Sequence, residues 1–169
     1  MTLRKILKLS FALASVMLAS GLCEAALPSL PEIDGWECGE LRSTDFNAVS
    51  GNQGIWLERD YRSPSRVPIK AVLMAGKGPG ELGALQPGID ASTALYGDGG
   101  TFRTLVTEGF PSILENRPIL GLSLSVNLGG ATATFESSAF ALAEDDFIEA
   151  ASVIIRSIKE NSLTDRGDG

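Results

Sequence analysis

The sequence GLSLSVNLGGATATFES, residues 121–137, carries the clearest structural signal in the chain. Its first half alternates apolar residues with serine and asparagine, the pattern of a strand that buries one face. Gly129-Gly130 then supplies the positive backbone angles of a two-residue hairpin turn. The stretch predicts an antiparallel hairpin packed against a core, with Ala133 opposite Val126 and Phe135 opposite Leu124.

A helix is expected to close the chain, at about 143–160. Its apolar residues recur at helical spacing and form one stripe. Three acidic residues, 144–146, occupy its first turn, and we expect Lys159 in its last turn, an arrangement that the helix dipole favours. The stripe consists of Phe147, Ile148, Ala151, Ile154, Ile155 and Ile158. Together these elements predict the α+β class, with an antiparallel β-meander sheet and a C-terminal amphipathic helix packed on one face.

Residues 54–62 and 66–74 predict a second hairpin, joined through a Ser-Pro-Ser turn. Placing Tyr61 opposite Val67 matches apolar side chains with apolar ones and sets Glu58 against Lys70, which cross-strand energetics favour. Further strands are expected at 101–107 and 111–117 and within 119–129. Residues 75–100 are rich in glycine and proline, so they predict a long surface loop.

The N-terminus has the pattern of a secretory signal peptide. Three basic residues precede an apolar stretch, Leu9–Leu22, that is too short for a membrane span. Cleavage after Ala25 is favoured, which places the protein in the periplasm or outside the cell. The alternative is a lipoprotein anchored through Cys23, the one case in which a membrane becomes a partner. Leu22 argues against it, because lipidation needs a small residue before the cysteine and leucine is large.

The expected organisation begins with a signal peptide at 1–25 and an extended lead-in at 26–53. The lead-in is either irregular or holds a short helix around Thr44 to Val49. One α+β domain at 54–160 and a frayed tail at 161–169 follow.

The composition removes several classes of chemistry. The chain has no histidine, so histidine-based nucleophile systems and the commonest zinc ligand are excluded. After cleavage Cys38 is the only cysteine, and the flanking Glu37 and Glu40 disfavour a reactive thiolate. The Gly-rich segment 76–83 lacks the Gly-Lys-Ser/Thr order of a phosphate-binding loop. The sequence therefore predicts no catalytic, cofactor-binding or metal-binding residue.

One charge feature stands out in a chain of net charge −7. Five of its 14 basic residues lie between Arg59 and Lys77, and they flank apolar side chains that are too large for a bare surface. These residues indicate either a docking patch with a basic rim or an edge strand that uses charge to prevent aggregation. The candidate partner-binding residues are Trp56, Arg62, Arg66, Lys70, Val72 and Met74.

Two parts of the chain resemble known families. The segment EGFPSILENRPILGLSLSVNLGGATATFES, followed by EDDFIEAASVIIRSIK, resembles small exported α+β domains of the PsbP/Mog1-like type. LPEIDGWE and WLERDYRSPSRVPIKAVLM resemble the N-terminal part of exosortase-associated envelope proteins. These resemblances imply a periplasmic accessory or binding role in a bacterium.

The sequence thus favours an exported, non-enzymatic binding or accessory domain of the cell envelope. Its expected partner is an envelope protein or an anionic envelope polymer, and the acidic balance argues against nucleic acid. One alternative is a carboxylate-dependent hydrolase of envelope polymers, using acids such as Glu58, Asp60 or Asp98. The other is a structural subunit of a secreted assembly.

Overall fold

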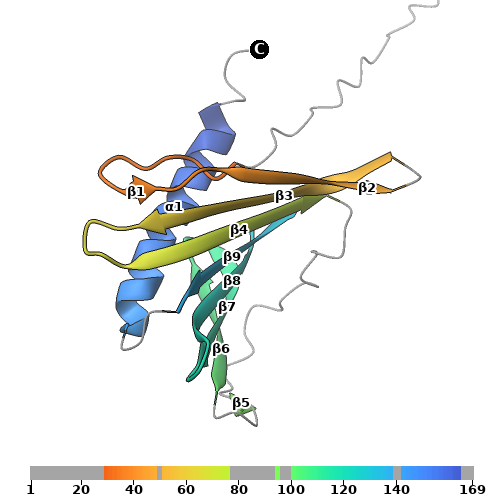
Figure 1. Ribbon diagram of the computed structural model, residues 1–169. Helices are drawn as coiled ribbons and strands as arrows, with labels where there is room; N and C mark the ends of the chain where they lie inside the picture. The colour runs from red at the N-terminus through yellow and green to blue at the C-terminus, as the bar shows by residue number, and fades with distance from the viewer. Residues whose placement is uncertain (1–28, 49–50, 77–93, 96–99, 139–141, 165–169) are drawn as a thin grey trace, which may run out of the picture.

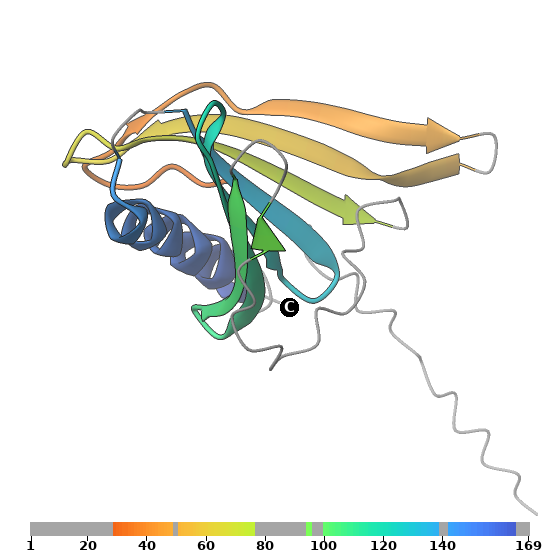
Figure 2. The same cartoon turned by 90° about the horizontal axis from the view of Figure 1, so that it is seen from below.

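The computed structural model describes residues 29–48, 51–76, 94–95, 100–138 and 142–164. In these residues nine strands form one antiparallel sheet, and a single helix, α1 (Glu144–Thr164), covers one face of it (Figure 1). The view from below shows the helix lying under the sheet at one end (Figure 2). The predicted α+β class is therefore confirmed.

The strand order is β1-β3-β4-β9-β8-β7-β6-β5. β1 and β2 follow one another along the same outer edge of β3, and both pair with it. Strands β1 to β4 form one half of the sheet and β5 to β9 form the other. The two halves join where β4 pairs with β9, so the sheet is not one continuous meander. The bounds are β1 (Glu37–Cys38), β2 (Arg42–Ala48), β3 (Gly51–Arg62), β4 (Pro68–Gly76), β5 (Ala94–Leu95), β6 (Thr101–Thr107), β7 (Phe110–Arg117), β8 (Gly121–Asn127) and β9 (Ala131–Ser137).

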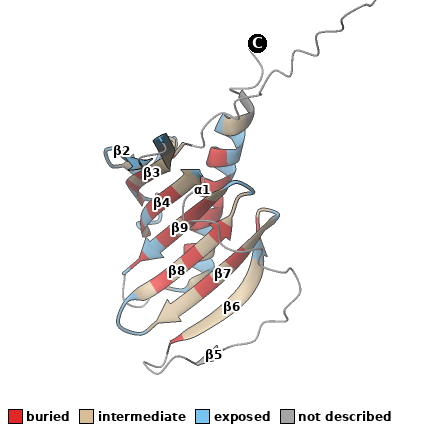
Figure 3. Ribbon diagram, turned by 90° about the vertical axis from the view of Figure 1, so that its right-hand side faces the viewer, coloured by how far each residue is buried: buried red, intermediate tan, exposed pale blue. Residues whose placement is uncertain are grey.

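The hairpin of β8 and β9 forms in the predicted register. Val126 lies opposite Ala133 and Leu124 opposite Phe135, and all four side chains are fully buried. Buried positions alternate with partly exposed ones along β8, as Figure 3 shows. The apolar set of this hairpin supplies the centre of the core because the helix packs directly over it.

The helix buries the predicted stripe except for Ile148, which is only partly buried. Phe147, Ala151, Ile154 and Ile155 have no exposed surface, and Ile158 is 3% exposed. The helix runs past the expected end at residue 160, so part of the tail that was predicted to fray is helical; residues 165–169 lie outside the described residues. Lys159 is consequently not in the last turn, and its ammonium lies 6.0 Å from the centre of the Phe110 ring.

The hairpin of β3 and β4 has the predicted faces but a register shifted by two residues. Tyr61 lies opposite Ile69, not Val67, and Glu58 lies opposite Val72, not Lys70. The cause is the turn, in which the Arg66 amide donates to the Ser63 carbonyl at 2.8 Å and Arg66 adopts a left-handed backbone with φ of 69°. A type I turn followed by a left-handed residue makes a three-residue loop, which moves the centre of the hairpin one residue along the chain.

The lead-in belongs to the domain, which corrects the expected boundary at residue 54. Residues 42–48 form β2, in place of an irregular segment or a short helix at Thr44 to Val49. Leu30 is 1% exposed within the core, and the Tyr61 hydroxyl donates a hydrogen bond of 2.7 Å to the Pro31 carbonyl. These contacts attach the lead-in to the sheet.

The signal peptide, Cys23 and most of the predicted loop at 75–100 lie outside the described residues. Within that loop, Ala94–Leu95 is described and forms β5, which pairs with Thr101 and Phe102 of β6. In the described part of the chain, α1 lacks the apolar length that crossing a bilayer requires.

Candidate functional site

The sheet face opposite the helix holds all of the residues that were predicted to form a docking patch except Arg66. Trp56 of β3 lies directly opposite Met74 of β4, and both side chains are partly exposed. Val72 lies on the same face but is only 7% exposed. Val72 therefore offers little surface to a partner.

The structure adds an aromatic residue that the sequence reasoning missed. Phe46 of β2 is 38% exposed, and its ring packs edge-to-face on Trp56 with the centroids 6.2 Å apart. We call Phe46, Trp56 and Met74 the Trp56 patch. β2 and β3 reach beyond the helix at one end of the sheet (Figure 2), and all three residues lie on the sheet face opposite the core residues Leu57 and Leu73.

The predicted basic rim is largely neutralised by acidic neighbours. Glu37 lies 3.6 Å from Arg62 and 3.3 Å from Arg66. Lys70 lies diagonally across from Glu58, with Nζ 3.3 Å from the carboxylate. The structure brings Arg62 and Lys70 to one face, whereas Arg66 sits in the turn between the two strands. An anionic partner would meet paired charges here, which reduces the attraction that the sequence suggested.

Arg42 joins this network from β2. Its Nη2 donates to Glu58 at 2.6 Å and to Asp60 at 3.0 Å. Because these two carboxylates surround the guanidinium, the pKa of Arg42 is raised, with the hydrogen bond to Asp60 as the largest cause. The pairing of Arg42 with Glu58 and Asp60 follows from β2, which the sequence reasoning did not predict.

Two of the carboxylates named for a hydrolase, Glu58 and Asp60, both accept hydrogen bonds from Arg42. Partial burial opposes the charge of Glu58, but Lys70 and Arg42 outweigh it and lower the pKa of that carboxyl. A general acid requires the opposite shift. Asp60 is bonded to Arg42, and Asp98 lies outside the described residues.

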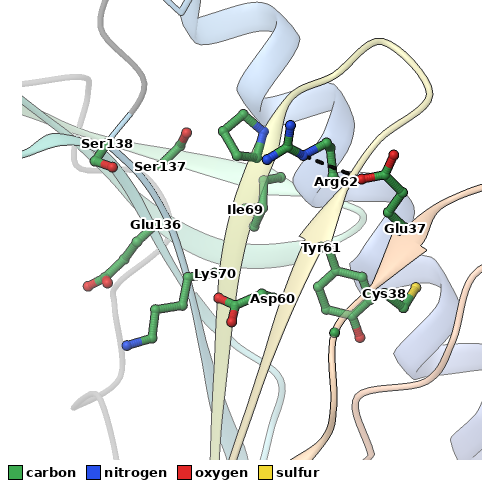
Figure 4. A pocket seen from close by; sticks show the side chains of 12 residues that line it. Glu37, Cys38, Asp60, Tyr61, Arg62, Ile69, Lys70, Glu136, Ser137 and Ser138 are labelled. Carbon is green, nitrogen blue, oxygen red and sulfur yellow. Dashed lines mark ion pairs between the residues drawn. The ribbon is translucent and has the colours of Figure 1, made fainter.

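A shallow groove of about 620 Å³ runs over the ends of β1, β3, β4 and β9 (Figure 4). Acidic and basic side chains alternate along it: Lys70 lies opposite Asp60 on one side and opposite Glu136 on the other. Cys38 lines it as a free, half-buried thiol. The groove is lined by Glu37, Cys38, Gly39, Asp60, Tyr61, Arg62, Pro68, Ile69, Lys70, Glu136, Ser137 and Ser138. Among the described residues no cluster of three or more acidic or cysteine side chains is placed to hold a metal ion.

Replacing Glu58 by glutamine is expected to lower the free energy of unfolding at neutral pH and to have a smaller effect in acid. The folded-state pKa of Glu58 lies below its unfolded value of about 4.3, so its contribution is present above that pH and disappears as the pH falls through the folded-state pKa. Urea unfolding of both proteins at about pH 7 and about pH 3 measures the difference.

The matched control is Glu149→Gln, which removes a carboxylate from the exposed side of α1. Its effect should be small at both pH values. A Glu58→Gln effect that stays the same at both pH values would contradict the assignment of Glu58 as an ion-paired carboxylate.

No family model, curated protein or solved structure matches this chain. The fold and the site define its class, an α+β domain with one antiparallel sheet, one covering helix and a partly exposed aromatic–methionine patch on the uncovered face.

Proposed function

We propose that this protein is an exported, non-enzymatic binding domain of the bacterial cell envelope, and that a partner protein docks on the Trp56 patch. The observation that carries the proposal is the packing of Phe46 on Trp56 beside Met74, on a part of the sheet that the helix does not cover. The basic, then apolar, N-terminal residues 4–22 support export.

The chemistry of the patch suits a protein partner. Tryptophan supplies a large contact area at a small cost in conformational entropy, and it is enriched among the residues that dominate binding energy. Methionine adapts its shape to a partner surface. The surrounding ion pairs form a polar rim around an apolar centre, which is the usual anatomy of a protein interface.

A protein surface with apolar side chains therefore fits better than an anionic polymer. A polymer needs unpaired positive charge, whereas Glu37 and Glu58 pair with the basic side chains of this face. Salt is then expected to have little influence on binding, because few counterions are displaced.

The proposal is tested by a photo-crosslinking amino acid at position 74 of the chain expressed in its native host. Met74 lies in β4, two strands in from the edge formed by β2, so a crosslink there reports a partner that covers the face. The control places the same amino acid at Val106, which is 65% exposed at the far side of the sheet. We expect one defined envelope protein to crosslink at position 74 and not at 106.

The partner identified in this way is then purified and titrated with the wild-type chain and with Trp56→Ala. Loss of a central aromatic residue typically costs about 2 kcal/mol or more, which corresponds to a roughly 30-fold or greater weakening. No crosslink at position 74, or equal affinity of the two chains, would remove the Trp56 patch as the binding site.

A further inference from the structure

No described strand pairs with the outer edge of β2. This strand pairs only with β3 among the described residues, and each side chain from Arg42 to Asn47 is exposed, as the pale colour of β2 in Figure 3 indicates. An exposed edge strand offers unpaired main-chain N–H and C=O groups that can pair with another strand. The segment contains no proline or lysine, two residues that commonly block such pairing.

The edge is also regular. The pairing of β2 with β3 contains one irregularity, between Phe46 and Asn47, and the register shows that the extra residue is Gln53 on β3. A bulge bends the strand that carries the extra residue. β2 therefore keeps its alternation of side chains along the whole open edge.

The sequence of this edge is self-complementary about Thr44. When two copies of β2 run antiparallel with Thr44 opposite Thr44, Ser43 of each copy faces Asp45 of the other. Arg42 of each copy then faces Phe46 of the other, on the same side of the sheet as the Trp56 patch. Hydroxyl–carboxylate, cation–aromatic and threonine–threonine pairs each favour this register.

The neighbouring register is less favourable. An axis through Asp45 would place two carboxylates directly opposite each other, which destabilises a strand pair. Asp45 makes no ion pair with any residue in the described ranges, so it is available to accept from Ser43 of a second copy.

We propose that the chain forms a two-fold symmetric dimer in which the β2 strands pair antiparallel about Thr44, so that one sheet continues through both copies. Such an interface is isologous: the same surface serves both subunits. It brings the two Trp56 patches to one face of the combined sheet. The inference does not depend on the proposed partner, because it concerns the main-chain edge of β2, which shares only Phe46 with the Trp56 patch, and it is measured on the purified chain alone.

The test uses two variants at the symmetry axis, Thr44→Lys and Thr44→Glu. Each places like charges opposite each other in the homodimer, whereas a mixture places lysine opposite glutamate. Sedimentation equilibrium at chain concentrations up to about 1 mM measures the dissociation constants. We expect the wild-type chain to dimerise, each variant alone to dissociate at least tenfold more readily, and an equimolar mixture to recover a heterodimer.

Ser65→Lys is the matched control, since it adds the same charge to an exposed position in the turn between β3 and β4. It should dimerise as the wild type does. Concentration-dependent protection of the β2 amides from hydrogen exchange in the wild-type chain provides a second readout that needs no variant.

Three results would overturn the inference: a wild-type chain that stays monomeric throughout the concentration range, a Thr44→Lys variant that dimerises normally, or a mixture that associates no better than its components. None of these results bears on the crosslink at position 74, so the dimer and the partner-binding function can fail separately.

Discussion

Replacing Phe147 by alanine should lower the free energy of unfolding by about 3 to 5 kcal/mol. Phe147 is the largest side chain of the helix stripe, has no exposed surface and begins the packing of α1 on the sheet. Its removal leaves a cavity that the rigid strands beneath cannot fill by moving. Because small domains are stable by about 5 to 15 kcal/mol in total, the loss should be visible as a large shift of the urea midpoint.

Glu149→Ala is the control on the same helix. Its side chain is exposed, so we expect a change within about 0.5 kcal/mol. A Phe147→Ala variant as stable as this control would mean that the helix does not pack on the sheet as described.

Gly121→Ala is expected to lower the free energy of unfolding by about 2 to 5 kcal/mol. A left-handed backbone costs a non-glycine residue about 1 to 2 kcal/mol, and overpacking adds about 1 to 3 kcal/mol. Gly121 opens β8 with φ of 94°, and a Cβ atom there would collide with the Ser137 carbonyl of β9. Neither strand can retreat without breaking its pairing, so the collision is not relieved by moving a flexible side chain.

Gly109→Ala separates the two causes. Gly109 has a similar φ of 87°, but a Cβ atom there would meet nothing within 4 Å. Only the conformational cost should remain, about 1 to 2 kcal/mol. Equal losses for the two variants, measured by thermal or urea unfolding, would show that the close approach of β8 and β9 is not the source of the Gly121 effect.

The elements that sequence reasoning found share one property, an alternation of buried and exposed positions. The β8–β9 hairpin and the helix stripe are amphipathic over several repeats, so the local pattern predicts both their type and their buried face. The same holds for β3 and β4, whose faces were predicted correctly although their register was not. A shift of two residues preserves the face of every side chain, so the pattern could not detect the error.

β2 was missed for the opposite reason. Its described side chains are all exposed, so the strand has no buried face and no hydrophobic period to detect. The only local hint was the spacing of Thr44 and Phe46, two residues suited to strands at alternate positions. Without β2, the sequence could not place Phe46 against Trp56 or Arg42 between Glu58 and Asp60.

The sequence by itself therefore determined the class of the domain, the central hairpin, the helix and which faces are apolar. Only the tertiary structure decided that β4 pairs with β9, that β2 forms the sheet edge and that Glu37 meets Arg62 and Arg66 of the β3–β4 hairpin. The physical reason is that a periodic pattern records how each residue is exposed to water. The choice of neighbouring strand depends instead on contacts between segments far apart in the chain, and no single segment carries that information.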